Sequence, residues 1–71
     1  MQRFGEKVRA LRIRRGLSQR ELAQALGYSA YSYISDIESG RTIPRVDLVV
    51  KSADFFHVSL DQIVRDELEV V

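Results

Sequence analysis

Apolar residues recur along this chain at intervals of three and four, the spacing of one face of an α-helix. Phe4, Val8 and Leu11 form the first such face and Gly16 ends the segment, which predicts a helix over about 3–15. The same spacing predicts further helices over about 19–26, from Ser29 or Ser32 to about 39, over about 46–57, and from about residue 60 onward. Helices this short are not stable alone in water, so we expect all five to share one core in an all-α fold.

Two of the predicted helices begin with a capping box. Ser18 is followed three residues later by Glu21, so the Ser18 hydroxyl can accept from a backbone N–H while the Glu21 carboxylate reaches back. Ser59 and Gln62 repeat this pattern before the last helix. Gly27 favours the left-handed conformation that ends the helix begun at Ser18.

The fourth segment is rich in valine, a residue typical of strands. Its apolar residues nevertheless keep helical spacing, which favours a helix with one core face. That face is expected to contain Val46, Val49, Val50, Ala53 and Phe56.

The chain leaves this helical pattern on both sides. Pro44 breaks the chain before the fourth helix, and His57 is expected to act only as its C-terminal cap. From Asp66 the tail DELEVV either extends the last helix, pairs with another chain or frays.

Length and composition predict one small domain over 1–71. The chain has no cysteine and one histidine, which excludes a disulfide or a thiolate zinc site and predicts neither a metal nor a cofactor. No apolar run approaches the roughly 20 residues that span a bilayer, and the N-terminal MQRFGEKVRA lacks the apolar stretch of a signal peptide. We therefore expect a cytoplasmic protein with no membrane contact.

The net charge of +1 conceals an uneven distribution along the chain. Residues 1–45 contain nine Lys or Arg against four Asp or Glu, a balance of +5, whereas residues 46–71 contain two against six, a balance of −4. A basic front can neutralise phosphates while an acidic back stays away from them. The alternative is an uneven solvated surface.

The stretch from Leu17 to Pro44 contains two predicted helices separated by a tight glycine turn. Two short amphipathic helices joined in this way are typical of a helix-turn-helix, which we place at about 18–39. The second helix of this motif enters the major groove of DNA. The sequence therefore predicts double-stranded DNA as a partner.

A combination of short motifs covers nearly the whole chain. They are Leu17-Ser18-Gln19, Glu21-Leu22-Ala23, Leu26-Gly27, the run YISDIESG from Tyr33 to Gly40, Pro44, and Val58-Ser59-Leu60-Asp61. Together they resemble the Cro and phage-repressor type of helix-turn-helix, also called the XRE family. The resemblance implies a compact, five-helix, lambda-repressor-like domain. The run YISDIESG is also similar to restriction-modification controller proteins, which are small dimeric regulators.

One departure from the family pattern lies between the two helices of the motif. The family usually has six steps from the turn glycine to the first core isoleucine of the recognition helix, whereas Gly27 and Ile34 are seven apart. Moving the added residue into the helix would turn Ile34 and Ile37 off the core, so we expect it in the turn at 28–30.

The resemblance implies that the first turn of the recognition helix faces base edges. The matching outward residues are Tyr31, Ser32, Ser35 and Asp36. None is an Arg, Asn or Gln, so hydroxyls, contact with a thymine methyl, water or DNA shape would carry the reading. Tyr31 has surface or turn packing as its alternative role. Asp36 either accepts from cytosine or pairs with a neighbouring Arg.

A second group of residues is expected to contact phosphates. Gln19 has this role by resemblance, with its side-chain amide and the free N–H groups of the helix start as donors. The full group is Gln19, Arg20, Tyr33, Arg41, Thr42, Arg45, Arg14 and Arg15. Ordinary solvated arginines are the alternative for the basic members.

Two charged residues are expected to have a structural role. In related proteins the positions of Arg12 and Glu38 form a partly buried ion pair that joins the first helix to the recognition helix. Removal of one partner alone would leave the other charge unsatisfied.

The fourth helix has more apolar residues than one core needs. Leu48 and Phe55 lie seven apart beside the expected core face, and a Phe in water is unusual. We expect a two-fold homodimer through Leu48, Phe55 and tail residues such as Leu68. The alternative is that Phe55 packs on its own domain.

These features predict a transcriptional regulator, either repressor or activator, that binds an inverted repeat as a homodimer. The alternative is an antitoxin or interaction module of a toxin-antitoxin or restriction-modification system, whose acidic half binds a basic protein. A toxin or RNA polymerase is the possible protein partner. An enzyme is the weakest interpretation, because the chain has no cysteine, one histidine and no glycine-rich phosphate loop.

Overall fold

The computed structural model describes residues 1–70, which contain five α-helices and no strand. The helices are α1 (Phe4–Arg14), α2 (Gln19–Ala25), α3 (Ser32–Glu38), α4 (Val46–Phe56) and α5 (Leu60–Val64). Each lies within a few residues of the segment predicted from apolar spacing. Of the two starts considered for the third helix, the structure has the later one, Ser32.

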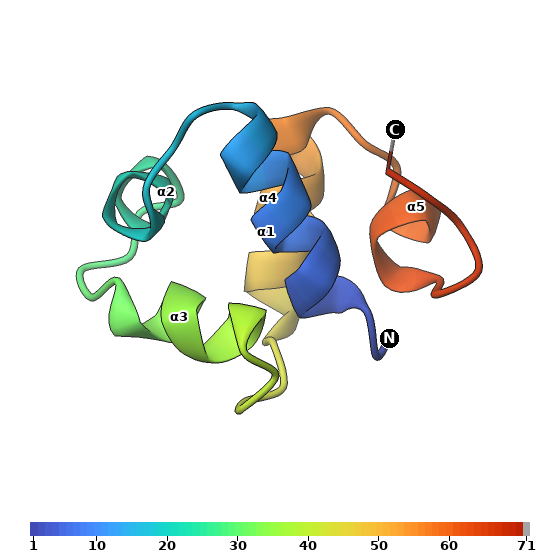
Figure 1. Cartoon of the computed structure of the whole chain (residues 1–71), viewed down its shortest axis with the longest axis horizontal. Helices are drawn as coiled ribbons and strands as arrows, with labels where there is room; N and C mark the ends of the chain where they lie inside the picture. Colours follow the sequence, from blue (N-terminus) through green and yellow to red (C-terminus); the bar gives the residue numbers. More distant parts are fainter. Residues whose placement is uncertain (71) are drawn as a thin grey trace.

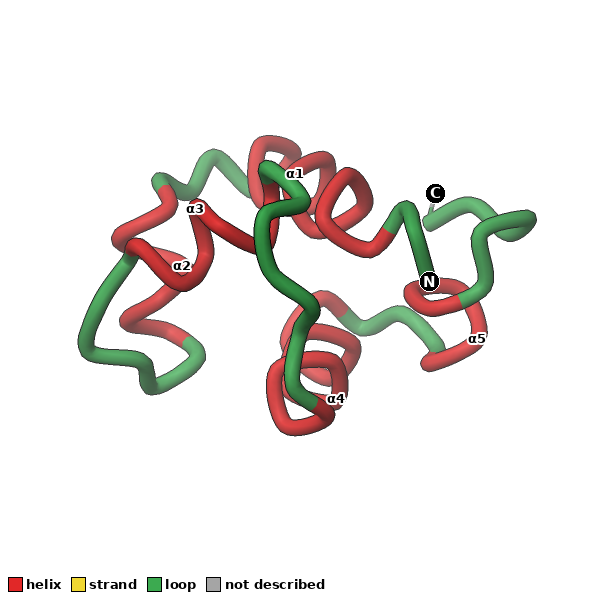
Figure 2. The backbone as a smooth tube through the Cα atoms, turned by 90° about the horizontal axis from the view of Figure 1, so that it is seen from below, coloured by secondary structure: helices red, strands yellow, loops and turns green. Residues whose placement is uncertain are grey.

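The helices α1 and α4 lie in the middle of the molecule (Figure 1). On one side of them lie α2 and α3, and on the other side α5 and the tail, an order that the view turned by 90° also shows (Figure 2). The N-terminus lies on the α5 side, where the amino group of Met1 is 3.7 Å from the carboxylate of Asp66. The predicted helix-turn-helix is thus separated in space from the two ends of the described chain.

The local signals for helix starts and ends agree with the structure. Both capping boxes form, with Ser18 accepting from the backbone N–H of Glu21 and Ser59 from that of Gln62. Gly27 has a φ of +85° after α2, a conformation that an L side chain would strain. His57 ends α4 in the left-handed conformation, as its predicted role as a C-terminal cap requires.

All five helices contribute to one apolar core. Its buried members are Phe4, Val8, Leu11, Leu22, Ala23, Leu26, Ile34, Ile37, Leu48, Val49, Ala53, Phe56, Ile63 and Val70. The backbones of α1 and α3 approach very closely, because a Cβ at Gly5 would lie 2.1 Å from the carbonyl oxygen of Ile37. A glycine in the first turn of α1 therefore fixes how near the recognition helix packs.

The predicted core face of α4 was partly wrong. Val46 is 79% exposed and Val50 is also exposed, while Leu48 and Ser52 are fully buried beside Val49. Apolar residues flank both edges of the core stripe of this helix, so its spacing fits two rotations about the axis. Packing against the other helices selects the rotation that buries Leu48.

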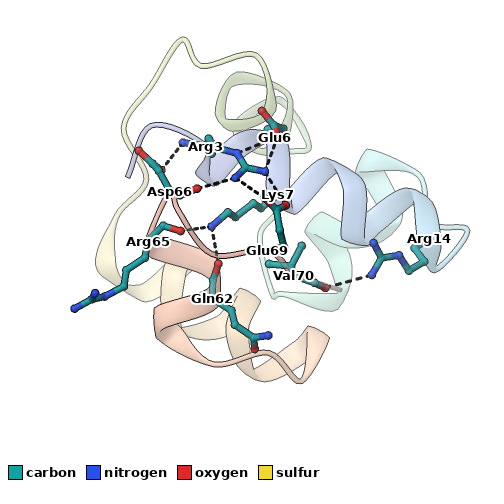
Figure 3. Close-up of polar contacts among 9 residues, drawn as sticks. All are labelled: Arg3, Glu6, Lys7, Arg14, Gln62, Arg65, Asp66, Glu69 and Val70. Atoms are coloured by element: carbon teal, nitrogen blue, oxygen red, sulfur yellow. Dashed lines mark hydrogen bonds and ion pairs between the residues drawn. The ribbon is translucent and has the colours of Figure 1, made fainter.

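The tail returns to α1 instead of extending α5 (Figure 3). The Asp66 carboxylate accepts from the backbone N–H groups of Gln2 (3.0 Å) and Arg3 (2.9 Å), and these two bonds hold the pKa of Asp66 below its ordinary value. The Arg3 guanidinium donates to the backbone carbonyl of Asp66 at 2.7 Å and pairs with Glu69 at 3.0 Å. Val70, the last described residue, is buried in the core.

A buried lysine joins α1 to the end of α5. Lys7 is 1% exposed, and its ammonium donates to the carbonyl oxygens of Gln62 (2.6 Å) and Arg65. Carbonyls at the end of a helix lack partners within the helix, so Lys7 supplies a C-terminal cap from another element. Sequence reasoning missed this residue, although its position between Phe4 and Leu11 on the apolar face was a signal.

Candidate nucleic-acid interface

The helices α2 and α3 are held together by apolar side chains on their inner faces. Ile34 and Ile37 of α3 are buried against the same core as Leu22 and Ala23 of α2. Residues 27–31 lie between the two helices and outside both. The residue added to the family pattern therefore lengthens the turn and leaves both isoleucines facing inward.

The outer face of the first turn of α3 contains the residues expected to contact bases. Tyr31 and Ser32 are exposed, and Ser35 is half-buried. Asp36 is half-buried and lies 3.4 Å from Nε of Arg41, so the structure shows the pairing with a neighbouring Arg that was one of its two expected roles.

A buried ion pair lies behind this surface. Nε of Arg12 donates to Glu38 at 2.7 Å and its Nη2 to the other carboxylate oxygen at 3.0 Å, a bidentate arrangement. The Glu38 side chain is 3% exposed. Arg12 also donates to the carbonyl of Leu17 at 2.8 Å, and Gln19 donates to Glu38 at 3.1 Å. The network joins α1, α2 and α3 and fixes the side chain of Gln19 at the edge of the outer surface.

Arg20 and Tyr31 meet in front of this network. The guanidinium carbon of Arg20 lies 4.9 Å from the centre of the Tyr31 ring, within the range of a cation–π interaction. The two side chains border an open depression together with Arg12, Ser18 and Gln19. They also border a second one beside the turn with Gln24 and Ala30, so they form a ridge between two hollows.

Tyr28 and Tyr33 attach the turn and α3 to α4. Their rings meet edge to face at 5.2 Å, and the Tyr33 hydroxyl accepts from the backbone N–H of Arg45 at 3.1 Å. The Tyr28 hydroxyl donates to Asp47 at 2.8 Å; burial first, and then this carboxylate, raise the pKa of Tyr28 to about 12. Tyr33 thus has a structural contact, and its expected contact with a phosphate stays a prediction.

Three further phosphate candidates lie in the segment after α3. Arg41, Thr42 and Arg45 are all exposed, on the chain that leads from the recognition helix to α4. Arg41 is oriented by Asp36 and by the Ser39 hydroxyl, to which its Nε donates at 3.1 Å.

Arg14 and Arg15 lie elsewhere, which corrects their assignment to the phosphate-contacting group. Nη1 of Arg14 donates to the carbonyl of Val70 at 3.3 Å, and Nη2 of Arg15 donates to the carbonyl of Phe55 at 3.2 Å. The guanidinium of Arg15 also lies 5.2 Å from the centre of the Phe55 ring. Both arginines therefore face the end of α4 and the tail, because the end of α1 points toward these elements and not toward α3.

The three residues expected in a dimer interface have different surroundings. Leu48 is 0% exposed and belongs to the core, so its expected role in an interface was wrong. Phe55 is half-buried, with Arg15 over its ring and the ring of Phe56 at 5.1 Å, as expected if it packs on its own domain. Leu68 is exposed in the tail.

The chain matches the helix-turn-helix family HTH_3 over residues 8–63. The chain belongs to this helix-turn-helix family. The match spans α2, α3 and most of the fold around them, and it confirms both the resemblance to the XRE type and the lambda-repressor-like fold. The similarity to restriction-modification controllers stays a prediction.

Helix-turn-helix regulators are also found among individual relatives. The chain is 35% identical over 63 residues to the cryptic phage CTXphi transcriptional repressor RstR of Vibrio cholerae, with 89% of this chain and 56% of the repressor covered. It is 33% identical over 64 residues to the uncharacterized HTH-type transcriptional regulator YazB of Bacillus subtilis (strain 168), with 90% and 91% covered. It is 33% identical over 69 residues to the ImmF control region 10 kDa protein of Bacillus phage phi105, with 97% and 76% covered. These matches support the expectation of a DNA-binding domain of regulators instead of an enzyme.

The helices of residues 1–70 are also too short or too polar for a bilayer. None of them has the length and apolar character needed to cross a membrane.

Proposed function

We propose that this helix-turn-helix domain binds double-stranded DNA at a specific sequence and regulates transcription. The observation that carries the proposal is the arrangement of α2 and α3. Ile34 and Ile37 anchor α3 in the core, which leaves Tyr31 and Ser32 exposed on the surface that enters the major groove in a helix-turn-helix. The regulator names of the relatives support the same function. We place its action in the cytoplasm, with the DNA.

Base contact is assigned to Tyr31, Ser32 and Ser35. Their hydroxyl groups can donate to and accept from base edges, and the Tyr31 ring can contact a thymine methyl group. Asp36 is assigned to orienting Arg41 because of the ion pair between them.

Phosphate contact is assigned to the residues that border this surface. They are Gln19, Tyr33, Arg41, Thr42 and Arg45. Binding through several phosphates releases counterions, so we expect affinity to fall by an order of magnitude or more between about 50 and 200 mM salt. An affinity that does not change over this range would contradict the assignment.

We further propose that the protein binds DNA as a two-fold homodimer. Two recognition helices would then enter successive major grooves about 34 Å apart, so the operator would be an inverted repeat with half-site centres about 10 base pairs apart. The interface is assigned to α5 and the tail, where Leu60 and Leu68 are exposed at 51% and 38%. These residues lie on the opposite side of α1 from the helix-turn-helix (Figure 1).

The dimer is tested by sedimentation at tens of micromolar protein. Leu68→Asp is expected to shift the population toward the 8.2 kDa monomer, because a carboxylate would be desolvated in the interface. Val46→Asp, on the exposed edge of α4, is the matched control. Dissociation by Val46→Asp alone would place the interface on α4, and a monomeric unsubstituted protein would exclude the dimer.

The antitoxin interpretation has less support from the structure. It needs acidic groups free to bind a basic partner, but Asp66 and Glu69 are engaged by the start of α1. A contact with RNA polymerase is compatible with the regulator, since binding just upstream of a promoter would place the proteins side by side.

The deciding experiment is selection of binding sites from a pool of random DNA duplexes. We expect enrichment of an inverted repeat with the spacing given above. A matched control is Ile34→Ser/Ile37→Ser, which should unfold the motif and abolish selection. Recovery of unenriched DNA by the folded, unsubstituted protein would overturn the proposed function.

A further inference from the structure

The recognition helix lacks the side chains that read purines through paired hydrogen bonds. Bidentate contact with guanine requires Arg or Lys, and bidentate contact with adenine requires Asn or Gln. The outward residues Tyr31, Ser32 and Ser35 offer only hydroxyl groups, and the carboxylate of Asp36 is engaged by Arg41. A strong base contact from this surface must therefore come from another element.

Arg20 of α2 is placed to supply that contact. Its guanidinium lies over the ring of Tyr31, the residue that directly precedes α3, at 4.9 Å from the ring centre. The end of the Arg20 side chain is thus located at the start of the recognition helix, although its backbone belongs to α2. The other two bordering arginines differ, because Arg41 pairs with Asp36 and Arg12 with Glu38.

The contact with Tyr31 leaves the hydrogen-bonding capacity of Arg20 free. The attraction between a guanidinium and an aromatic ring acts through the ring face and needs no N–H acceptor. Among residues 1–70, Arg20 has only this aromatic contact and no carboxylate partner. A planar group with five donors, held in one place before DNA arrives, loses less conformational freedom on binding.

Resting on the proposed function, we propose that Arg20, held by Tyr31, reads a guanine in the major groove through its O6 and N7 atoms. This replaces the phosphate contact expected for Arg20 from the sequence. The two roles differ in what they demand of the side chain. A phosphate accepts any cation, whereas a guanine read at two atoms requires the fork of a guanidinium.

The test is binding-site selection followed by affinity measurement on duplexes changed at one position, with the full chain. The variants are Arg20→Lys, Tyr31→Phe, Tyr31→Leu and the double variant Arg20→Lys/Tyr31→Leu. Arg45→Lys, at a proposed phosphate contact, is the matched control. Circular dichroism confirms that each variant folds, which is expected because Arg20, Tyr31 and Arg45 are all exposed.

The unsubstituted protein is expected to select one guanine in each half-site, and Arg20→Lys to lower the preference for that guanine about 10-fold. Tyr31→Phe keeps the ring and should keep this preference. Tyr31→Leu should lower it at the same position, and the double variant should lose no more than Arg20→Lys alone. Arg45→Lys should leave every base preference unchanged.

The inference is overturned if Arg20→Lys weakens binding to all sequences equally, which would assign Arg20 to a phosphate. It is also overturned if no selected guanine responds to Arg20→Lys while an inverted repeat is still selected. In both cases the proposed function stands. Failure of the unsubstituted protein to select any sequence would instead overturn the proposed function and this inference with it.

Discussion

Two polar residues join helices of this domain that are distant in sequence. Glu38 accepts hydrogen bonds from Arg12 of α1 and Gln19 of α2, so it joins three helices at one carboxylate. Lys7 has a comparable place between α1 and α5. Neither contact lies on the outer surface assigned to DNA, so their loss should lower stability before it changes sequence preference.

The first prediction concerns the Arg12–Glu38 ion pair. Glu38→Ala leaves the guanidinium of Arg12, whose side chain is 12% exposed, without its counterion. We expect a loss of about 3–5 kcal/mol in the free energy of unfolding, measured by urea denaturation. The double variant Arg12→Met/Glu38→Leu should lose less, since it removes both charges. A melting temperature of Glu38→Ala equal to that of the unsubstituted protein would refute the role.

The second prediction concerns Lys7. Lys7→Met keeps the length of the side chain but leaves two buried carbonyl oxygens without a donor, so we expect a loss of about 1–3 kcal/mol in the free energy of unfolding. Arg9→Met, on the exposed face of α1, is the control and should change stability by no more than about 0.5 kcal/mol. Equal effects of the two substitutions would exclude a capping role for Lys7.

At the scale of whole elements, the position of α3 depends on how near it comes to α1. The third prediction is that Gly5→Ala destabilises the domain by about 1–3 kcal/mol, because the added Cβ would overlap the carbonyl of Ile37. Thermal unfolding measures the loss. Ala10→Gly, at an exposed site of the same helix, is the control for helix propensity and should cost about 1 kcal/mol. Stabilisation by Gly5→Ala would show that the helices can move apart freely.

The rotation of α4 is the element that the sequence predicted least well. Val46 and Val50 extend the apolar stripe on one edge, and Leu48 and Ser52 occupy the other. Periodicity gives the helix but not which edge is covered, since that depends on where α1 and α5 lie. Burial of Leu48 also removed one of the residues expected in the dimer interface.

At the scale of the molecule, the two charge-rich parts of the chain do not form two separate faces. Arg3 belongs to the basic part, yet it contacts Asp66 and Glu69 of the acidic tail (Figure 3). Basic groups available to DNA are therefore fewer than the sequence count suggested, and they are concentrated at α2 and after α3.

The fourth prediction concerns stability in acid. Backbone N–H groups lower the pKa of Asp66 below its ordinary 3.8, and Arg3 lowers the pKa of Glu69 below its ordinary 4.5. A lowered pKa in the folded state means that the stabilisation is complete above these ordinary values and is lost as the pH falls through the folded-state pKa. We expect the free energy of unfolding to decline below about pH 5.

Urea denaturation across this pH range tests the contribution of the tail. Asp66→Asn should lower stability at neutral pH and flatten the decline in acid, while Asp54→Asn on the exposed face of α4 should leave the decline unchanged. An unaltered acid decline in Asp66→Asn would show that the contact between the tail and α1 does not persist in solution.

The sequence by itself determined what depends on neighbouring residues. Helix existence, the two capping boxes, the glycine turn and the inward isoleucines of α3 follow from spacing and from contacts within one turn, so they could be predicted. Only the tertiary structure decided which edge of α4 is buried, that Lys7 caps α5, where the tail goes and which arginines face away from α3. These depend on contacts between residues far apart in the chain, which local periodicity does not encode.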